Sequence, residues 1–172
     1  MSSLSSHASD PSTPDRGRLP HHREVPFQPP NPSTPAGEKI LRRLREELFL
    51  WLIPVDASGM PHPLPVGFLW DEAQSSFLIY SAAREDGDRR WQYLQQNPKV
   101  GLHFNLDPGG ADSFILTGEA KVSLDDPSSD QVRAWVAKYQ TFFSQMGLSM
   151  QQVAEVLPIA LRIRPLTMIA SA

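Results

Sequence analysis

Residues 62–81 read HPLPVGFLWDEAQSSFLIYS, and this stretch decides the fold. In its first part, residues 62–70, apolar side chains alternate along the chain and share one face: Leu64, Val66, Phe68 and Trp70. Such alternation is typical of a β-strand with one face in a protein core. A second strand is expected at residues 75–81, SSFLIYS, after a short polar connection. Consecutive strands joined this closely favour antiparallel pairing.

The first of these strands carries prolines at alternate positions, Pro61, Pro63 and Pro65. Alternate residues direct their backbone groups to the same edge, so one edge of the strand lacks N–H donors. That edge is expected to face solvent, a partner chain or a ligand. Gly67 interrupts the opposite face and would let a flat ring approach the backbone closely. An ordinary proline-rich edge strand explains the same pattern equally well.

The rest of the chain extends this pattern on both sides. Further strands are predicted at residues 48–56, 99–107, 114–123 and 157–169, from apolar runs or period-two alternation. Helices are predicted from Thr34-Pro35 to residue 48, over residues 88–97 and 126–147, and after Ser149, whose spacing to Gln152 fits a capping box. The order predicts a mainly β protein with peripheral helices, a six-stranded antiparallel split β-barrel.

Composition narrows the class of protein. The chain has 172 residues, enough for one domain, and no cysteine, which excludes disulfides and thiolate metal sites. A net charge of −3 argues against nucleic-acid binding, which usually needs a basic surface. The longest apolar run, residues 48–55, is too short to cross a membrane, and residues 1–25 show no secretory signal. We therefore expect a cytoplasmic protein.

Residues 1–33 are expected to form a disordered arm, leaving residues 34–172 as the folded domain. The arm is rich in Ser, Pro and His and nearly lacks apolar side chains. Such a segment cannot bury enough surface to offset its ordering entropy. His21 and His22 resemble a metal-binding pair, but two ligands are insufficient for a site. No residue is therefore assigned to a metal.

Two adjacent arginines give the sharpest local signal. Arg89 and Arg90 lie in the first turn of the helix predicted over residues 88–97. Cations there oppose the helix dipole, and the conflict disappears if an anion binds. Ser81, at the end of the preceding strand, could add a hydroxyl to a phosphate site. Two solvated arginines are the alternative, and the sequence alone favours neither.

The chain shows no motif for nucleophilic catalysis. His62 and His103 lie on different predicted strands, and a lone strand histidine is more often structural than catalytic. No catalytic residue is therefore assigned. Chemistry on this scaffold would require a cofactor.

Four segments together resemble a known family: PVGFLWD (65–71), FLIYS (77–81), NPKVGLHF (97–104) and LTGEA (116–120). In this order they resemble the pyridoxamine 5'-phosphate oxidase-like FMN-binding split-barrel superfamily, over about residues 40–169. The branch they resemble most contains small flavin/deazaflavin oxidoreductases that use coenzyme F420.

This resemblance implies a homodimer with the cofactor, F420 (a deazaflavin) or FMN, in a groove between protomers. In the family, a basic residue seven positions before the Asn-Pro pair holds the phosphate; it is usually lysine, and Arg90 stands there in this chain. The family commonly has an aromatic residue where Gly67 stands, and its loop corresponding to residues 82–88 is shorter. The cofactor-binding residues expected from these arguments are Val66, Gly67, Phe68, Tyr80, Ser81, Arg89 and Arg90.

The implied function is hydride transfer between the bound cofactor and a small unsaturated or conjugated substrate. A different class of function stays open, in which the same fold binds and sequesters a flavin or haem without catalysis. The sequence identifies no substrate.

Overall fold

The computed structural model describes residues 23–82, 90–105 and 114–170. In these residues it has the helices α1 (Pro35–Glu46), α2 (Arg90–Gln96), α3 (Arg133–Gln145) and α4 (Met150–Val156). Its strands are β1 (Arg23–Pro26), β2 (Phe49–Pro54), β3 (Leu64–Gly67), β4 (Leu69–Asp71), β5 (Ser76–Ser81), β6 (Lys99–His103), β7 (Phe114–Val122) and β8 (Ile159–Ala170).

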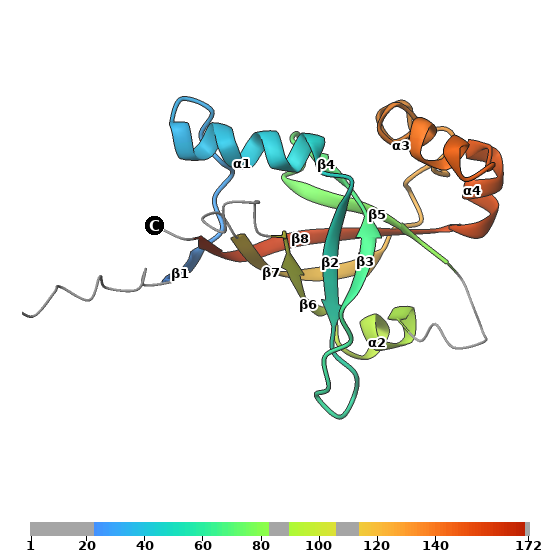
Figure 1. Cartoon of the computed structure of the whole chain (residues 1–172). Helices are drawn as coiled ribbons and strands as arrows, with labels where there is room; N and C mark the ends of the chain where they lie inside the picture. Colours follow the sequence, from blue (N-terminus) through green and yellow to red (C-terminus); the bar gives the residue numbers. More distant parts are fainter. Residues whose placement is uncertain (1–22, 83–89, 106–113, 171–172) are drawn as a thin grey trace, which may run out of the picture.

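The strands form one antiparallel sheet that curls into a nearly closed barrel (Figure 1). Its order is β3-β2-β6-β7-β8-β5-β4, and β1 pairs with β8 outside this path. The two ends of the path, β3 and β4, are separated in the chain by the single residue Phe68. One continuous segment therefore pairs with β2 before Phe68 and with β5 after it, which brings the ends of the sheet together.

The prediction of a mainly β, antiparallel barrel is confirmed, but the count of six strands is wrong. The strand expected over residues 62–70 is two strands, because the N–H of Phe68 donates to the hydroxyl of Tyr139 and not to a neighbouring strand. The second additional strand is β1, which lies within the residues expected to form a disordered arm. Residues 23–26 of the expected arm therefore belong to the sheet, and residues 1–22 lie outside the described residues.

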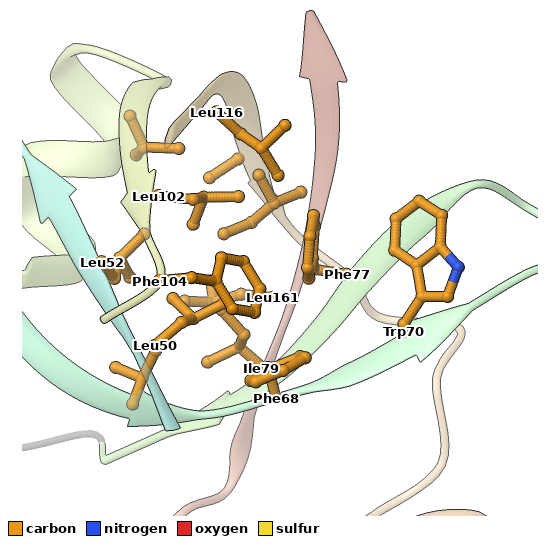
Figure 2. Packing of buried hydrophobic residues seen from close by; sticks show 14 of the residues in the cluster. Leu50, Leu52, Phe68, Trp70, Phe77, Ile79, Leu102, Phe104, Leu116 and Leu161 are labelled. Carbon is orange, nitrogen blue, oxygen red and sulfur yellow. The ribbon is translucent and has the colours of Figure 1, made fainter. Parts of the chain in front are cut away.

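The interior of the barrel is filled by the alternating apolar residues of its strands. Figure 2 shows leucines of β2, β6, β7 and β8 converging with aromatic side chains around Phe68 and Phe77. Phe68, Phe77 and Phe104 have no exposed surface. Burying one such side chain contributes about 1.5–3 kcal/mol, so this cluster is the main stabilising element of the barrel.

Strand β5 is buried along its whole length, which explains its unbroken apolar run FLIY. Phe77 and Ile79 face the barrel interior, whereas Leu78 and Tyr80 pack in a second cluster with Trp135 and Tyr139 of α3. Helices α3 and α4 therefore cover the outer face of β5 (Figure 1).

Two of the predicted helix starts are confirmed by their capping bonds. The Thr34 hydroxyl accepts from the Gly37 N–H, and Ser149 and Gln152 form the expected capping box. Helix α3 begins at Arg133, later than the expected residue 126, because Asp126 is bonded to Arg162. Helices α1 and α2 lie at opposite ends of the barrel (Figure 1).

Candidate functional site

The side chains of Val66 and Phe68 point into the barrel core. Val66 is buried and Phe68 is fully enclosed by other aromatic rings. The side chains of these two residues are therefore not available to a ligand. The alternation of residues 64–70 already indicated this orientation.

Gly67 does allow a flat ring to approach, and the ring is the chain's own Tyr139. A Cβ atom at Gly67 would lie 3.1 Å from the Tyr139 hydroxyl and 3.2 Å from Cζ. The close approach predicted at this glycine is thus used for packing between β3 and α3. A cofactor ring would have to lie elsewhere.

The break between β3 and β4 is stabilised by two side chains of α3. The Tyr139 hydroxyl accepts from the Phe68 N–H at 2.6 Å and donates to the Leu48 carbonyl oxygen at 2.5 Å. Lys138 Nζ donates to the Phe68 carbonyl oxygen at 2.9 Å and lies 3.8 Å from the centre of the Phe68 ring. Both backbone groups of Phe68 are therefore satisfied by side chains about 70 residues away in the sequence.

Burial changes the acidity of both α3 groups. It raises the pKa of Tyr139 well above the usual range of tyrosine, so the hydroxyl stays protonated. It lowers the pKa of Lys138 to about 8, while the charge of Glu47 acts in the opposite direction. Both residues lie in the helix predicted over residues 126–147, but the sequence gave no sign of either contact.

Tyr80 is also engaged within the protein. Its hydroxyl donates to the Pro127 carbonyl oxygen at 2.6 Å, and its ring meets Trp135 edge-on with centroids 4.8 Å apart. Burial, together with the nearby charge of Asp126, raises the pKa of Tyr80 to about 12. The phenol is therefore a neutral structural donor. Ser81 is buried at the end of β5.

Helix α2 begins at Arg90, and Arg89 lies outside the described residues. Ser81 ends β5 and Arg90 begins α2, so the predicted phosphate-binding residues flank one connection of the chain. The helix is fixed to the barrel through Leu94, which belongs to the core cluster. Its Tyr93 ring stacks on His62, with centroids 4.7 Å apart and planes 26° apart.

His62 is itself held by an aspartate in the β2–β3 hairpin. His62 Nε2 lies 2.9 Å from Asp56 Oδ2, and Asp56 Oδ1 accepts from the Ser58 hydroxyl and from the N–H groups of Ser58 and Met60. These bonds, that of the Ser58 hydroxyl first and that of His62 next, hold the pKa of Asp56 well below its usual range. The carboxylate is therefore charged at neutral pH.

A polar cavity of about 620 Å³ lies beside β7 and β8, and the sequence did not reveal it. Its main feature is Arg162, which forms a two-bond pair with Asp126 and a further bond of 2.8 Å to Asp71. Arg162 also holds the pKa of Asp126 below its usual range. These partners are 36 and 91 residues away from Arg162, so no local pattern could have indicated them.

A shallower depression of about 400 Å³ lies on the outer face of β6 and β7. It is lined mainly by apolar groups around Gly101, with Lys99 and Thr117 as the polar members. In the described ranges, no three His, Asp or Glu residues are grouped as metal ligands would be. The helices described are also too short or too polar to span a membrane.

A sequence model of the family described as pyridoxamine 5'-phosphate oxidase matches residues 36–163. No curated protein sequence matches the chain. The fold resembles that of a putative pyridoxamine 5'-phosphate oxidase from Listeria innocua, with TM-score 0.54 and 21% identity over 77% of this chain and 95% of that one.

Two further solved structures share the fold. The haem storage protein HutZ from Vibrio cholerae has TM-score 0.52 and 18% identity, over 74% of this chain and 88% of its own. A protein described as an F420 reductase has TM-score 0.50 and 17% identity, over 74% of this chain and 94% of its own. At these identities the likeness concerns the fold alone.

Proposed function

The chain belongs to the pyridoxamine 5'-phosphate oxidase family, and on this basis we propose that it is an oxidoreductase that binds F420 or FMN. Its reaction is hydride transfer between that cofactor and a small unsaturated or conjugated substrate. The observation that carries the proposal is the extent of the family match, which runs from α1 into β8 and includes Ser81 and Arg90.

Arg90 is the residue that binds the phosphate of the cofactor. A guanidinium can donate two parallel N–H bonds to a phosphate, and such charge-assisted bonds are stronger than neutral ones. Ser81, at the other end of the same connection, adds a hydroxyl donor. Both groups suit a phosphate. Since α2 has only seven residues, the guanidinium and not the helix end supplies the binding.

The other predicted residues support the site from around it. Val66 and Gly67 can offer only backbone groups, because their side-chain positions are filled by the core and by Tyr139. Phe68 holds this segment in place, since its backbone groups are bonded to Tyr139 and Lys138. Tyr80 holds the end of β5 through its bond to Pro127 and so fixes the neighbouring Ser81. Arg89 adds a second positive charge near the phosphate.

When bound, the cofactor supplies the hydride chemistry, and the chain binds and orients the reactants. The two buried phenols cannot act as bases at neutral pH, because Tyr80 and Tyr139 have raised pKa values and are bonded to backbone groups. Catalysis then depends on holding cofactor and substrate in contact, which is a large effect when the geometry is correct.

The active unit is a homodimer with the cofactor in a groove between protomers. Strand β3 is the end strand of the sheet path and carries Pro65. Its neighbour β2 exposes the large side chains of Phe49 and Trp51, each 37% exposed. Exposed aromatic groups beside an end strand are typical of protein–protein contact surfaces.

The second candidate is a non-catalytic flavin- or haem-binding protein. It is supported by the fold shared with the haem storage protein HutZ. In that case the protein would bind a flavin or haem and sequester it without catalysis.

Titration of the purified full-length protein with F420, FMN and haem tests these functions. We expect saturable binding of F420 or FMN, with quenching of its fluorescence, and reduction of a conjugated substrate by the loaded protein. Binding of haem alone, seen as a Soret band, would favour sequestration. Binding of none of the three would refute both candidates.

A further inference from the structure

The tip of the β2–β3 hairpin is a rigid unit with His62 at its base. Asp56 accepts three hydrogen bonds from within the loop, and the His62 N–H donates to the Pro54 carbonyl oxygen at 2.9 Å. A bridge between Val55 and Pro61 closes the loop. The Asp56 carboxylate then fixes the His62 ring through Nε2.

This hairpin touches α2 through one aromatic stack. The loop and α2 lie at the same end of the barrel (Figure 1), and the rings of His62 and Tyr93 stack with centroids 4.7 Å apart. The next residue, Leu94, is 5% exposed and belongs to the barrel core. Leu94 thus fixes where α2 lies, and the His62 stack fixes its rotation about its own axis.

Arg90 is placed by these two contacts. On a helix, residues three and four positions apart share a face, so Arg90 lies one turn from both Tyr93 and Leu94. In the described residues, these two contacts join α2 to the hairpin and to the barrel core. A rotation of α2 would change the position of Arg90 in its first turn.

We propose that His62 is a positioning residue for the cofactor's phosphate: held by Asp56, it stacks on Tyr93 and thereby sets the position of Arg90. This rests on the proposed function, since it names a residue that acts through Arg90. The three groups are not a hydrolytic triad, because the Ser58 hydroxyl donates to Asp56 and not to His62. Their role is structural preorganisation of an anion site.

A double-mutant cycle between His62 and Arg90 tests this, with F420 and FMN as probes on the full-length protein. His62→Ala alone should weaken binding roughly three- to tenfold, a range typical of coupled neighbouring sites. In the Arg90→Ala background the same change should have no further effect. His62→Phe, which keeps a flat ring for Tyr93, should restore most of the affinity. His103→Ala is the matched control, because His103 is also half-buried and, among the described residues, its ring does not stack on Tyr93.

A second measurement does not depend on the cofactor. Amide hydrogen exchange of the empty protein should become faster in α2 for both His62→Ala and Tyr93→Leu, with the β-strands unchanged. Unchanged exchange in α2, or additive effects of His62→Ala and Arg90→Ala on affinity, would overturn the proposal while leaving the proposed function intact. If the wild type binds neither probe, the proposed function fails, and the role of His62 toward the phosphate fails with it.

Discussion

The hydroxyl of Tyr139 lies 2.6 Å from the backbone nitrogen of Phe68, the single residue between β3 and β4. It also donates to the carbonyl of Leu48, the residue before β2, so one phenol joins the β3–β4 junction to the start of β2. The nearly closed barrel therefore depends on α3, which follows these strands in the chain by about 70 residues.

Tyr139→Phe should destabilise the protein by about 1–3 kcal/mol, because the Phe68 N–H would be buried without a partner and the half-buried Leu48 carbonyl would lose its donor. Urea unfolding followed by tryptophan fluorescence measures this change. Tyr93→Phe is the control, since no hydrogen bond to the Tyr93 hydroxyl is seen in the described part of the chain, and it should change stability by less than about 0.5 kcal/mol. Equal effects of the two substitutions would contradict the assigned role of Tyr139.

Gly67→Ala should lower stability by about 1–3 kcal/mol through overpacking. The new Cβ would lie 3.1–3.3 Å from the hydroxyl oxygen and two ring carbons of Tyr139, which its hydrogen bonds hold in place. Gly101→Ala is the matched control on β6, where the nearest atom is Ile53 Cβ at an ordinary 3.4 Å. Thermal melting should therefore separate the two variants, with only Gly67→Ala lowering the melting temperature clearly.

The stability of the protein should rise with pH above about 8 because of Lys138. Its pKa is lowered to about 8 in the folded state, against about 10.4 for an ordinary lysine. Between these values the unfolded chain binds one more proton than the folded one, so the free energy of unfolding increases with pH. Below pH 8 both states are protonated and the dependence vanishes.

Unfolding by urea at pH 7.5, 8.5 and 9.5 tests this, in a range where most tyrosines remain protonated. The rise should be absent in Lys138→Met and retained in Lys121→Met, a substitution at an exposed lysine. A rise of the same size in Lys138→Met would show that another group causes it.

Arg90→Ala should weaken binding of the cofactor about ten- to a hundredfold, since each charge-assisted hydrogen bond contributes about 1.5–3 kcal/mol. Arg90→Lys should lose less, because it keeps the charge but not the two-bond geometry. Arg133→Ala is the matched control, because Arg133 is the first residue of α3 as Arg90 is of α2. Isothermal titration with FMN and F420 gives the affinities, and an unchanged affinity in Arg90→Ala would remove the phosphate assignment.

The sequence predicted most elements of the fold because each has a local signal. Period-two alternation marked β7 over residues 114–122, and the Ser149–Gln152 spacing marked the start of α4. The break at Phe68 had no such signal, since nothing within residues 62–70 indicates a hydroxyl arriving from α3. Strand β1 was missed because four residues are too few to show a periodic pattern.

The candidate site was predictable to a smaller extent. The end of β5 and the start of α2 followed from pattern, which placed Ser81 and Arg90 at either end of one connection. The packing of Tyr139 on Gly67, the bond of Tyr80 to Pro127 and the network of Arg162 all join residues far apart in the chain. Such contacts depend on the completed barrel, and a single sequence does not contain them as a local pattern.

The pairing of β1 with β8 has a consequence for self-association. Strand β8 is the longest in the described chain; β7 covers one of its edges, whereas β5 pairs with residues 159–163 and β1 with residues 167–170. Without residues 23–26, the last part of β8, residues 167–170, would present unpaired backbone donors and acceptors on one edge. Such an edge is a template for adding strands from other molecules. The short strand β1 therefore protects the barrel against edge-to-edge aggregation, and a shortened chain that begins at residue 34 would lack this protection.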